Sequence, residues 1–237
     1  MVDDSQMRRG QETASSIWGN EAAVLVGDYL YSRAFQLMVL ANSLRIMNLM
    51  ADTTNTIAQG EVLQLLNINE PDTSEEAYHQ VIYRKTACLF EAAARIGAII
   101  SNAGEATEQA LGEYGTNLGI AFQLVDDALD YEADSSELGK NVGDDLAEGK
   151  PTLPLIHAMQ NAGSDDAALI RQAIEQGGLQ HIDQITRIIR QTGALAYTHQ
   201  QAIQHADLAK ASLAGLPPTA ARQALEFVAD YSVKRSH

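Results

Sequence analysis

The stretch EATEQALGEYGTNLGIAFQLVDDALDY, residues 105–131, is long, lacks proline and predicts a single helix. Gly112, Gly115 and Gly119 lie along one stripe of this helix, and the stripe continues into polar residues near its end. Glycine inside a helix costs about 1 kcal/mol relative to alanine. We therefore expect a close approach at this face to offset the cost, by either a neighbouring helix or a ligand chain.

The end of the same helix carries Asp126, Asp127 and Asp130 within one turn. Residues three and four apart on a helix are neighbours, so these carboxylates are expected to converge on a common cavity. One interpretation is the solvated acidic face of an amphipathic helix. The other is a site for a hard cation, because Mg²⁺ prefers oxygen ligands and commonly joins one or two carboxylates to substrate phosphates. A calcium loop does not fit, since its D-x-D-x-D-G spacing is absent.

Helical patterns extend over the rest of the chain. Two proline-free segments rich in Ala, Leu and Met occupy residues 20–42 and 43–66. Thr73 and Glu76 form a capping-box pattern that predicts a further helix through about Ser101.

A polar, glycine-punctuated loop follows the acidic helix and leads to Pro151, which we expect in the first turn of the next helix. Shorter helices fill the remainder. Neither a useful alternating strand pattern nor a tandem repeat occurs, so the sequence predicts one all-α domain over residues 1–237.

Composition narrows the function. A formal net charge of -15 argues against nucleic-acid binding, which needs a basic surface. The single cysteine, Cys88, excludes an internal disulfide and is expected to be a buried structural thiol. No apolar run reaches the ~18 residues of a membrane-spanning helix, and the first residues lack a signal-peptide core. We expect a soluble, cytoplasmic protein without stable membrane insertion.

Basic residues recur in short motifs beside acidic ones. Lys140 and Lys150 flank Asp144 and Asp145 in the glycine-rich loop directly after the acidic helix. A lone lysine or arginine is usually a solvated surface charge. The combination with the aspartates instead favours a site where cations and basic side chains share an anionic substrate such as a diphosphate.

The order of these motifs resembles that of a known family. The chain begins with D-x4-RRG, continues with GNEAAVLVGDYL, GEVLQL and YRKTA, and then carries FQLVDDALDY and LGKNVGDDLAEGKPTLP. The series is similar to that of the trans-polyprenyl diphosphate synthases, most of all the bacterial octaprenyl-type enzymes, and covers almost the whole chain. The resemblance implies antiparallel helices around a deep central cavity, a homodimer, and Mg²⁺ held on an allylic diphosphate.

The resemblance also implies roles for individual residues. FQLVDDALDY is similar to the second aspartate-rich motif of the family, and Asp3 matches the last aspartate of the first. The implied metal ligands are Asp3, Asp126, Asp127 and Asp130. The implied substrate-binding residues are Arg8, Arg9, Gln64, Lys85, Thr86, Gln123, Lys140 and Lys150. Among them, the implied catalytic residues are Lys85, Gln123, Lys140 and Lys150, which would support the allylic substrate or hold the departing diphosphate.

The implied reaction is head-to-tail condensation of isopentenyl diphosphate onto an allylic diphosphate such as farnesyl diphosphate. Mg²⁺ and cationic side chains would neutralise the charge that builds on the leaving diphosphate. The product would be a long-chain polyprenyl diphosphate, the precursor of a quinone side chain. No Ser/His/Asp or Cys/His arrangement is required for this chemistry.

The chain departs from the family pattern at its start. The first motif of the family reads D-D-x-x-D, and only its last aspartate is matched here. We expect the N-terminal part of the family domain to be missing, with apolar surface exposed around Ala23, Val24 and Leu25 unless a dimer partner covers it. We also expect little elongation activity from the chain as written. Two alternatives stay open: an inactive partner or binding subunit, and a terpene cyclase-like enzyme of the same fold.

Overall fold

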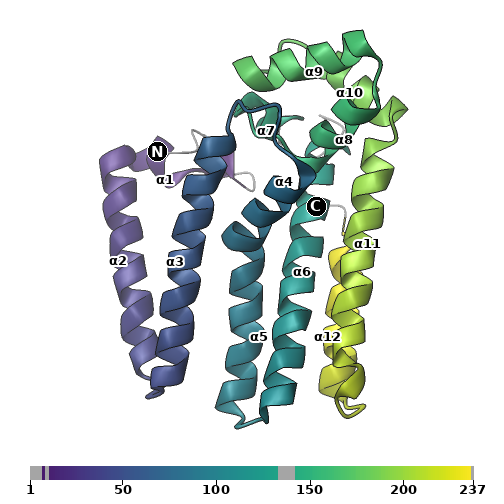
Figure 1. Ribbon diagram of the computed structural model, residues 1–237. Coiled ribbons are helices and arrows are strands. Elements are labelled where there is room, and N and C mark those ends of the chain that lie inside the picture. Colours follow the sequence, from purple (N-terminus) through teal and green to yellow (C-terminus); the bar gives the residue numbers. More distant parts are fainter. Residues whose placement is uncertain (1–6, 9–10, 133–141, 236–237) are drawn as a thin grey trace.

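A computed structural model of the protein describes residues 7–8, 11–132 and 142–235, and these are almost entirely helical (Figure 1). The strands β1 (Met7–Arg8) and β2 (Gln11–Glu12) form one small antiparallel pair. The helical elements are α1 (Ala14–Trp18), α2 (Asn20–Val39), α3 (Leu44–Asn67), α4 (Glu75–Ile82), η1 (Tyr83–Ala87), α5 (Cys88–Ile100), α6 (Glu105–Glu132), α7 (Asp144–Ala147), α8 (Leu153–Asn161), α9 (Ser164–Gln176), α10 (Ile182–Gln191), α11 (Ala194–Ser212), η2 (Leu213–Gly215) and α12 (Ala220–Ser232). The predicted all-α class is confirmed.

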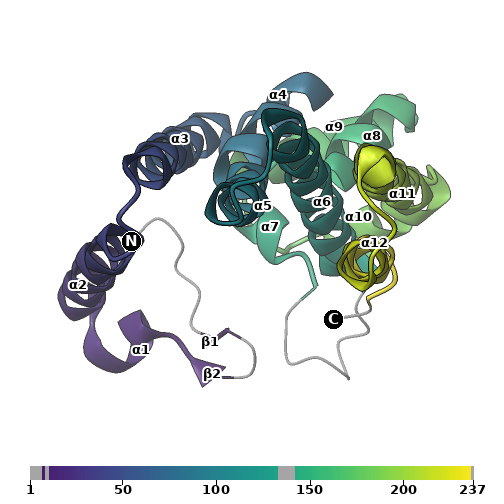
Figure 2. The same cartoon turned by 90° about the horizontal axis from the view of Figure 1, so that it is seen from below.

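Long helices run side by side, and α6 lies in the middle of them (Figure 1). It packs most extensively against α5 on one side and α11 on the other. Seen from below, α2, α3, α5, α6 and α11 follow an arc, with α12 beside α11 (Figure 2). The short helices α7 to α10 gather at the end of the bundle where α6 finishes (Figure 1).

The glycine stripe of α6 is explained by close helix packing. A Cβ atom added at Gly115 would lie 2.5 Å from the carbonyl oxygen of Phe90, and one added at Gly119 would lie 2.6 Å from Cα of Ala87. Both neighbours are backbone atoms, so a side chain at either glycine would push α5 and η1 away from α6. Of the two explanations for the stripe, the neighbouring helix is therefore the correct one at these positions.

The helix predicted to run through about Ser101 is interrupted. Its middle, η1, is a π-helix, a rare element that occurs mostly as single turns and often at functional sites. At this turn α3 comes unusually close, because a Cβ atom on Gly60 would lie 2.8 Å from both Cβ of Arg84 and the backbone nitrogen of Lys85. Cys88 follows directly and is 5% exposed, with its thiol donating to the Arg84 carbonyl at 2.9 Å. The predicted burial of this thiol is confirmed.

The predicted cap of α4 was wrong by one residue. Ser74 is the N-cap, and its hydroxyl oxygen accepts the backbone N–H of Ala77 at 3.1 Å. The Thr73 hydroxyl instead donates to the carbonyl of Glu70 at 2.8 Å, within the preceding turn. Thr and Ser form both kinds of contact with nearby backbone, so the sequence pattern alone did not separate them.

The prediction for Pro151 was also wrong. Helix α8 begins at Leu153 with Thr152 as its N-cap, and Pro154 is the proline in its first turn. The N–H of Thr152 donates to the carbonyl of Lys150 at 3.0 Å, which closes a turn around Pro151.

The helix α2 has no fully buried side chain among the residues that the structure describes. Val24 is 52% exposed and Leu25 is 68% exposed, while Ala23 is half-buried. The predicted apolar exposure in this segment is confirmed. None of the described helices has the length and apolarity that crossing a membrane requires.

Candidate active site

Many of the predicted site residues meet at the end of the bundle where α6 finishes. They surround a cavity of about 100 Å³ between α3, α4, η1, α6 and the turn before α8. The polar and charged side chains that line it include those of Gln64, Tyr78, Lys85, Thr86, Gln123, Asp127, Asp145, Lys150 and Thr152. The fold thus brings together segments that are more than eighty residues apart in sequence.

Lys85 stands in the π-helical turn, against the end of α3. Its Nζ atom donates to Oε1 of Gln64 at 2.8 Å and lies 3.3 Å from a carboxylate oxygen of Glu61. Among the described residues, Nε2 of Gln64 is buried without a hydrogen-bond partner. The cavity therefore contains the charge of Lys85 and a polar group that remains available to a ligand or to water.

Asp127 is the most buried of the three aspartates, at 4% exposure. Its Oδ2 atom accepts the hydroxyl of Tyr78 at 2.6 Å, and Oδ1 accepts Nε2–H of Gln123 at 2.8 Å. The amide oxygen of Gln123 in turn accepts the hydroxyl of Thr86 at 3.0 Å. Burial raises the pKa of Asp127 well above its usual range, and the nearby charge of Asp145 raises it further, while the bonds from Tyr78 and Gln123 oppose the shift.

Asp130 joins the end of α6 to α7. Its two carboxylate oxygens accept the backbone N–H groups of Asp144 at 3.2 Å and of Asp145 at 3.1 Å. Burial raises the pKa of Asp130 to about 7, and the charge of Asp145 contributes to that shift. The carboxylate thus holds the loop that carries two further acidic residues close to the helix.

Asp126 is exposed and belongs to a different group of contacts. Its Oδ1 atom accepts a hydrogen bond from the guanidinium of Arg235 at 2.8 Å, and that guanidinium lies 3.9 Å from the ring centroid of Phe122. Of the three aspartates, Asp127 alone lines the 100 Å³ cavity. The charge of Asp126 nevertheless raises the pKa of Asp145, which lines the cavity, and the expectation that all three aspartates face one cavity stays a prediction. The residues that hold them come from distant parts of the chain, which helix spacing does not reveal.

Lys150, in the turn before α8, also lines the cavity. Its Nζ atom is 3.7 Å from Asp145 and also forms an ion pair with Glu148. Burial raises the pKa of Asp145. The charge of Glu148 raises this pKa further, whereas the charges of Lys150 and Lys85 lower it. Both lysines therefore act on the same acidic group, Asp145.

Four predicted residues cannot be placed in this cavity. Arg8 belongs to strand β1, and its side chain is not described. Asp3, Arg9 and Lys140 lie outside the described residues.

The acidic residues suit a cation bound together with a phosphate ligand. Burial raises the pKa of Asp127, Asp130 and Asp145, and the charge of Asp145 raises the pKa of the other two further; a divalent cation would favour the charged carboxylates. Among the described residues, no three His, Cys, Asp or Glu side chains form a ready metal-binding group. Mg²⁺ does not need one, because it is usually held by one or two carboxylates with waters and substrate phosphates. The residues present fit such a shared site.

Tyr78, Asp145 and Arg235 were not predicted as site residues. Tyr78 lies seven positions before Lys85, which corresponds to two helical turns. The spacing therefore indicated that both residues share a helix face. Asp145 belongs to the motif LGKNVGDDLAEGKPTLP, between Lys140 and Lys150. Arg235 is 109 residues from Asp126 and carries no local signal.

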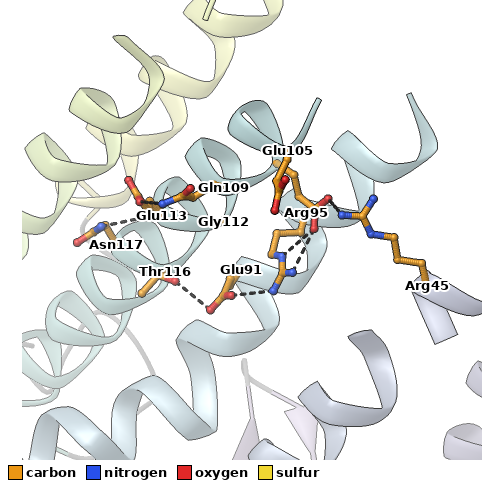
Figure 3. A pocket seen from close by; sticks show the side chains of 10 residues that line it. Arg45, Glu91, Arg95, Glu105, Gln109, Gly112, Glu113, Thr116 and Asn117 are labelled. Carbon is orange, nitrogen blue, oxygen red and sulfur yellow. Dashed lines mark hydrogen bonds and ion pairs between the residues drawn. The ribbon is translucent and has the colours of Figure 1, made fainter. Parts of the chain in front are cut away.

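A larger cavity, of about 430 Å³, lies toward the other end of α5 and α6 (Figure 3). Glu108, in the first turn of α6, forms ion pairs there with Arg45 of α3 and Arg95 of α5. Arg95 also contacts Glu91 at 3.3 Å. The carboxylate of Glu108 is 6% exposed, so this network clamps three helices together at the base of the bundle.

Comparison with known proteins identifies the family of the chain. Residues 1–192 match the family model described as Polyprenyl synthetase. The chain is 52% identical to octaprenyl diphosphate synthase of Haemophilus influenzae and 51% identical to that of Escherichia coli, with 100% and 99% of this chain aligned to 72% and 73% of those proteins. A crystal structure of a polyprenyl synthase from Caulobacter crescentus, complexed with calcium and isoprenyl diphosphate, superimposes with a TM-score of 0.95 at 44% identity, covering 100% of this chain and 73% of that one. With the motifs, the fold and the cavity all in agreement, the chain belongs to the polyprenyl synthetase family.

Proposed function

We propose that this chain carries a prenyltransferase site, in which isopentenyl diphosphate is condensed head-to-tail onto an allylic diphosphate. The relatives named above make octaprenyl diphosphate, which supports a long-chain polyprenyl diphosphate as the product. Enzymes of this family use divalent metal ions. We propose Mg²⁺ as that ion here, held by Asp126, Asp127 and Asp130 together with substrate oxygens.

The observation that carries the proposal is the meeting of Lys85 and Lys150 with Asp127 and Asp145 around one cavity. A diphosphate bound through metal ions needs carboxylates for the metal and cations for the remaining phosphate charge. The two lysines provide that charge. Each of them contacts acidic groups, Lys85 at Glu61 and Lys150 at Asp145 and Glu148, and a diphosphate would take over part of those contacts.

The proposed chemistry begins with ionisation of the allylic C–O bond. A metal ion held by the aspartates would supply Lewis-acid stabilisation of the leaving diphosphate. Lys85 and Lys150 stabilise the same developing negative charge, and Thr86 and Gln123 orient the allylic substrate beside them. The double bond of isopentenyl diphosphate then attacks the allylic carbocation, and loss of a proton gives a product longer by one isoprene unit. Repetition of this cycle gives the long chain.

We also propose that the chain forms a homodimer through the apolar face of α2 and α3. Leu25 and Leu30 on α2, and Leu44 and Leu66 on α3, are each at least 60% exposed. Large apolar side chains exposed along both helices favour a protein–protein interface on this side of the bundle. Sedimentation velocity should show a dimer, and a Leu25→Lys/Leu44→Lys variant should be monomeric.

Calorimetry with farnesyl diphosphate tests the binding function. We expect binding that requires Mg²⁺, disappears with chelator and weakens at least tenfold in Asp126→Ala, because a carboxylate ligand is lost. Asp165→Ala is the matched control, since Asp165 is an exposed aspartate on α9, and it should bind as the unmodified chain does. Binding that ignores both the chelator and the Asp126 substitution would refute the metal–diphosphate site. Incorporation of radiolabelled isopentenyl diphosphate then measures elongation directly.

A further inference from the structure

A buried tyrosine is linked to the proposed site by a chain of hydrogen bonds. Tyr78 belongs to α4 and is 4% exposed, with its ring packed in the core cluster that includes Ile82 and Leu124. Its hydroxyl is the only polar group of the side chain, and it donates to Oδ2 of Asp127 at 2.6 Å. A hydroxyl donor to a carboxylate at this distance is a strong, charge-assisted hydrogen bond.

The chain of contacts continues across the cavity wall. Asp127 accepts the amide N–H of Gln123 at 2.8 Å, and Gln123 accepts the hydroxyl of Thr86 at 3.0 Å. Because both ends of the Gln123 amide are engaged, its orientation is fixed: the nitrogen faces Asp127 and the oxygen faces Thr86. Thr86 is the neighbour of Lys85 in the π-helical turn. One phenol on α4 is thus connected through α6 to the segment that presents the lysine.

We propose that Tyr78 is a positioning residue of the active site, which fixes the carboxylate of Asp127 and, through it, the Gln123 amide that faces the allylic substrate. This inference rests on the proposed function and deepens it. Carboxylates that bind metals are themselves usually held by hydrogen bonds, and loss of such an outer contact typically lowers metal affinity or activity about 10–100-fold. Tyr78 is the side chain that supplies this contact from outside α6.

The packing around Tyr78 fixes the position of its hydroxyl group. The ring is enclosed by apolar side chains, and its two side-chain torsions therefore have little freedom. A water molecule that donated to Asp127 at the same place would not be held by such packing. Removing the hydroxyl while keeping the ring leaves the core filled, and among the described residues Gln123 is then the remaining side-chain donor to the carboxylate.

Tyr78→Phe is the test, with Tyr114→Phe as the matched control. Tyr114 is also a buried tyrosine, at 3% exposure, but its hydroxyl donates at 2.9 Å to the carbonyl of Leu225, in a different core cluster. Calorimetry with farnesyl diphosphate and a titration of Mg²⁺ measure ligand affinity and metal dependence. Thermal unfolding measures stability independently of either.

We expect Tyr78→Phe to weaken Mg²⁺-dependent farnesyl diphosphate binding about 10–100-fold and to raise the Mg²⁺ midpoint, whereas Tyr114→Phe changes both less than threefold. Similar losses of thermal stability in the two variants would separate positioning from folding. Equal ligand affinity in the two variants would overturn the inference while leaving the proposed function intact. If the unmodified chain binds no diphosphate, the proposed function itself fails.

A double-mutant cycle of Tyr78→Phe and Gln123→Ala provides a second, independent test. If Tyr78 acts through the Asp127–Gln123 pair, its substitution should cost clearly less affinity in the Gln123→Ala background than in the unmodified chain. Fully multiplicative effects of the two substitutions would show that Tyr78 acts by another route. Should Tyr78→Phe not fold, Thr86→Val combined with Gln123→Ala tests the other end of the same chain, where multiplicative losses would likewise overturn it.

Discussion

Gly115→Ala tests the close packing that sets the distance between α5 and α6. The added Cβ atom would lie 2.5 Å from the carbonyl oxygen of Phe90 and 2.7 Å from Cα of Glu91. These are backbone atoms, so no side-chain rotation relieves the contact. The two helices must separate locally, and that separation loosens the packing along their shared interface.

Two effects of opposite sign determine the magnitude. Replacing glycine by alanine in a helix stabilises it by about 1 kcal/mol. Overpacking of a well-packed interior costs about 1–3 kcal/mol, and a clash with backbone belongs at the upper end. Subtracting the first from the second leaves a net destabilisation of about 2 kcal/mol for Gly115→Ala. In a chain of this length, that lowers the Tm by about 4–8 °C.

Thermal unfolding of purified Gly115→Ala and Gly97→Ala provides the comparison. Gly97 lies within α5, and no described atom outside its local helix backbone lies within 4 Å of a Cβ built there. The same substitution should therefore stabilise the chain at Gly97, by about 0.5–1 kcal/mol. A Gly115→Ala variant as stable as Gly97→Ala would refute the packing argument. In that case the glycine stripe of α6 would face a ligand. The Gly115→Ala substitution would then change diphosphate binding and leave the thermal stability unchanged.

The ion-pair network at the base of the bundle and one histidine give further predictions. Glu108→Gln should destabilise the chain by about 1–3 kcal/mol in urea unfolding, because it leaves the buried end of a three-helix clamp without its charge. The exposed Glu113→Gln is the control, and it should stay within about 0.5 kcal/mol. A hydrogen bond from His199 to Glu132, at 2.7 Å, raises the pKa of that histidine above 6.5. Its stabilisation is therefore complete below pH ~6.5 and lost as the pH rises through the folded-state pKa. The Tm difference between the unmodified chain and Glu132→Gln should shrink from pH 6 to pH 8, and a constant difference would contradict the assignment.

Local patterns in the sequence determined the helices and much of the site. The helix predicted over residues 105–131 is observed as Glu105–Glu132, and the all-α class follows from the same periodicity elsewhere. Helix spacing grouped Gln123 with the three aspartates at the end of this helix, because residues three, four and seven apart share a helix face. The other motif residues around the cavity follow from the resemblance to the trans-polyprenyl diphosphate synthases, and spacing alone does not identify them. Hydrogen bonding and side-chain contact within one or two turns depend only on nearby residues, so the sequence contains the information needed to predict them.

Tertiary structure decided how those residues are held. The π-helical turn that carries Lys85 coincides with the close approach of Gly60 from α3, which helical periodicity does not encode. Adjacent aspartates acquired unrelated partners: Asp126 pairs with Arg235, from 109 residues away, whereas Asp127 accepts Tyr78, from 49 residues away. Identical side chains with nearly identical local surroundings differ here because each faces a different neighbouring element. The position of those elements follows from the packing of the whole bundle, and no segment specifies it alone.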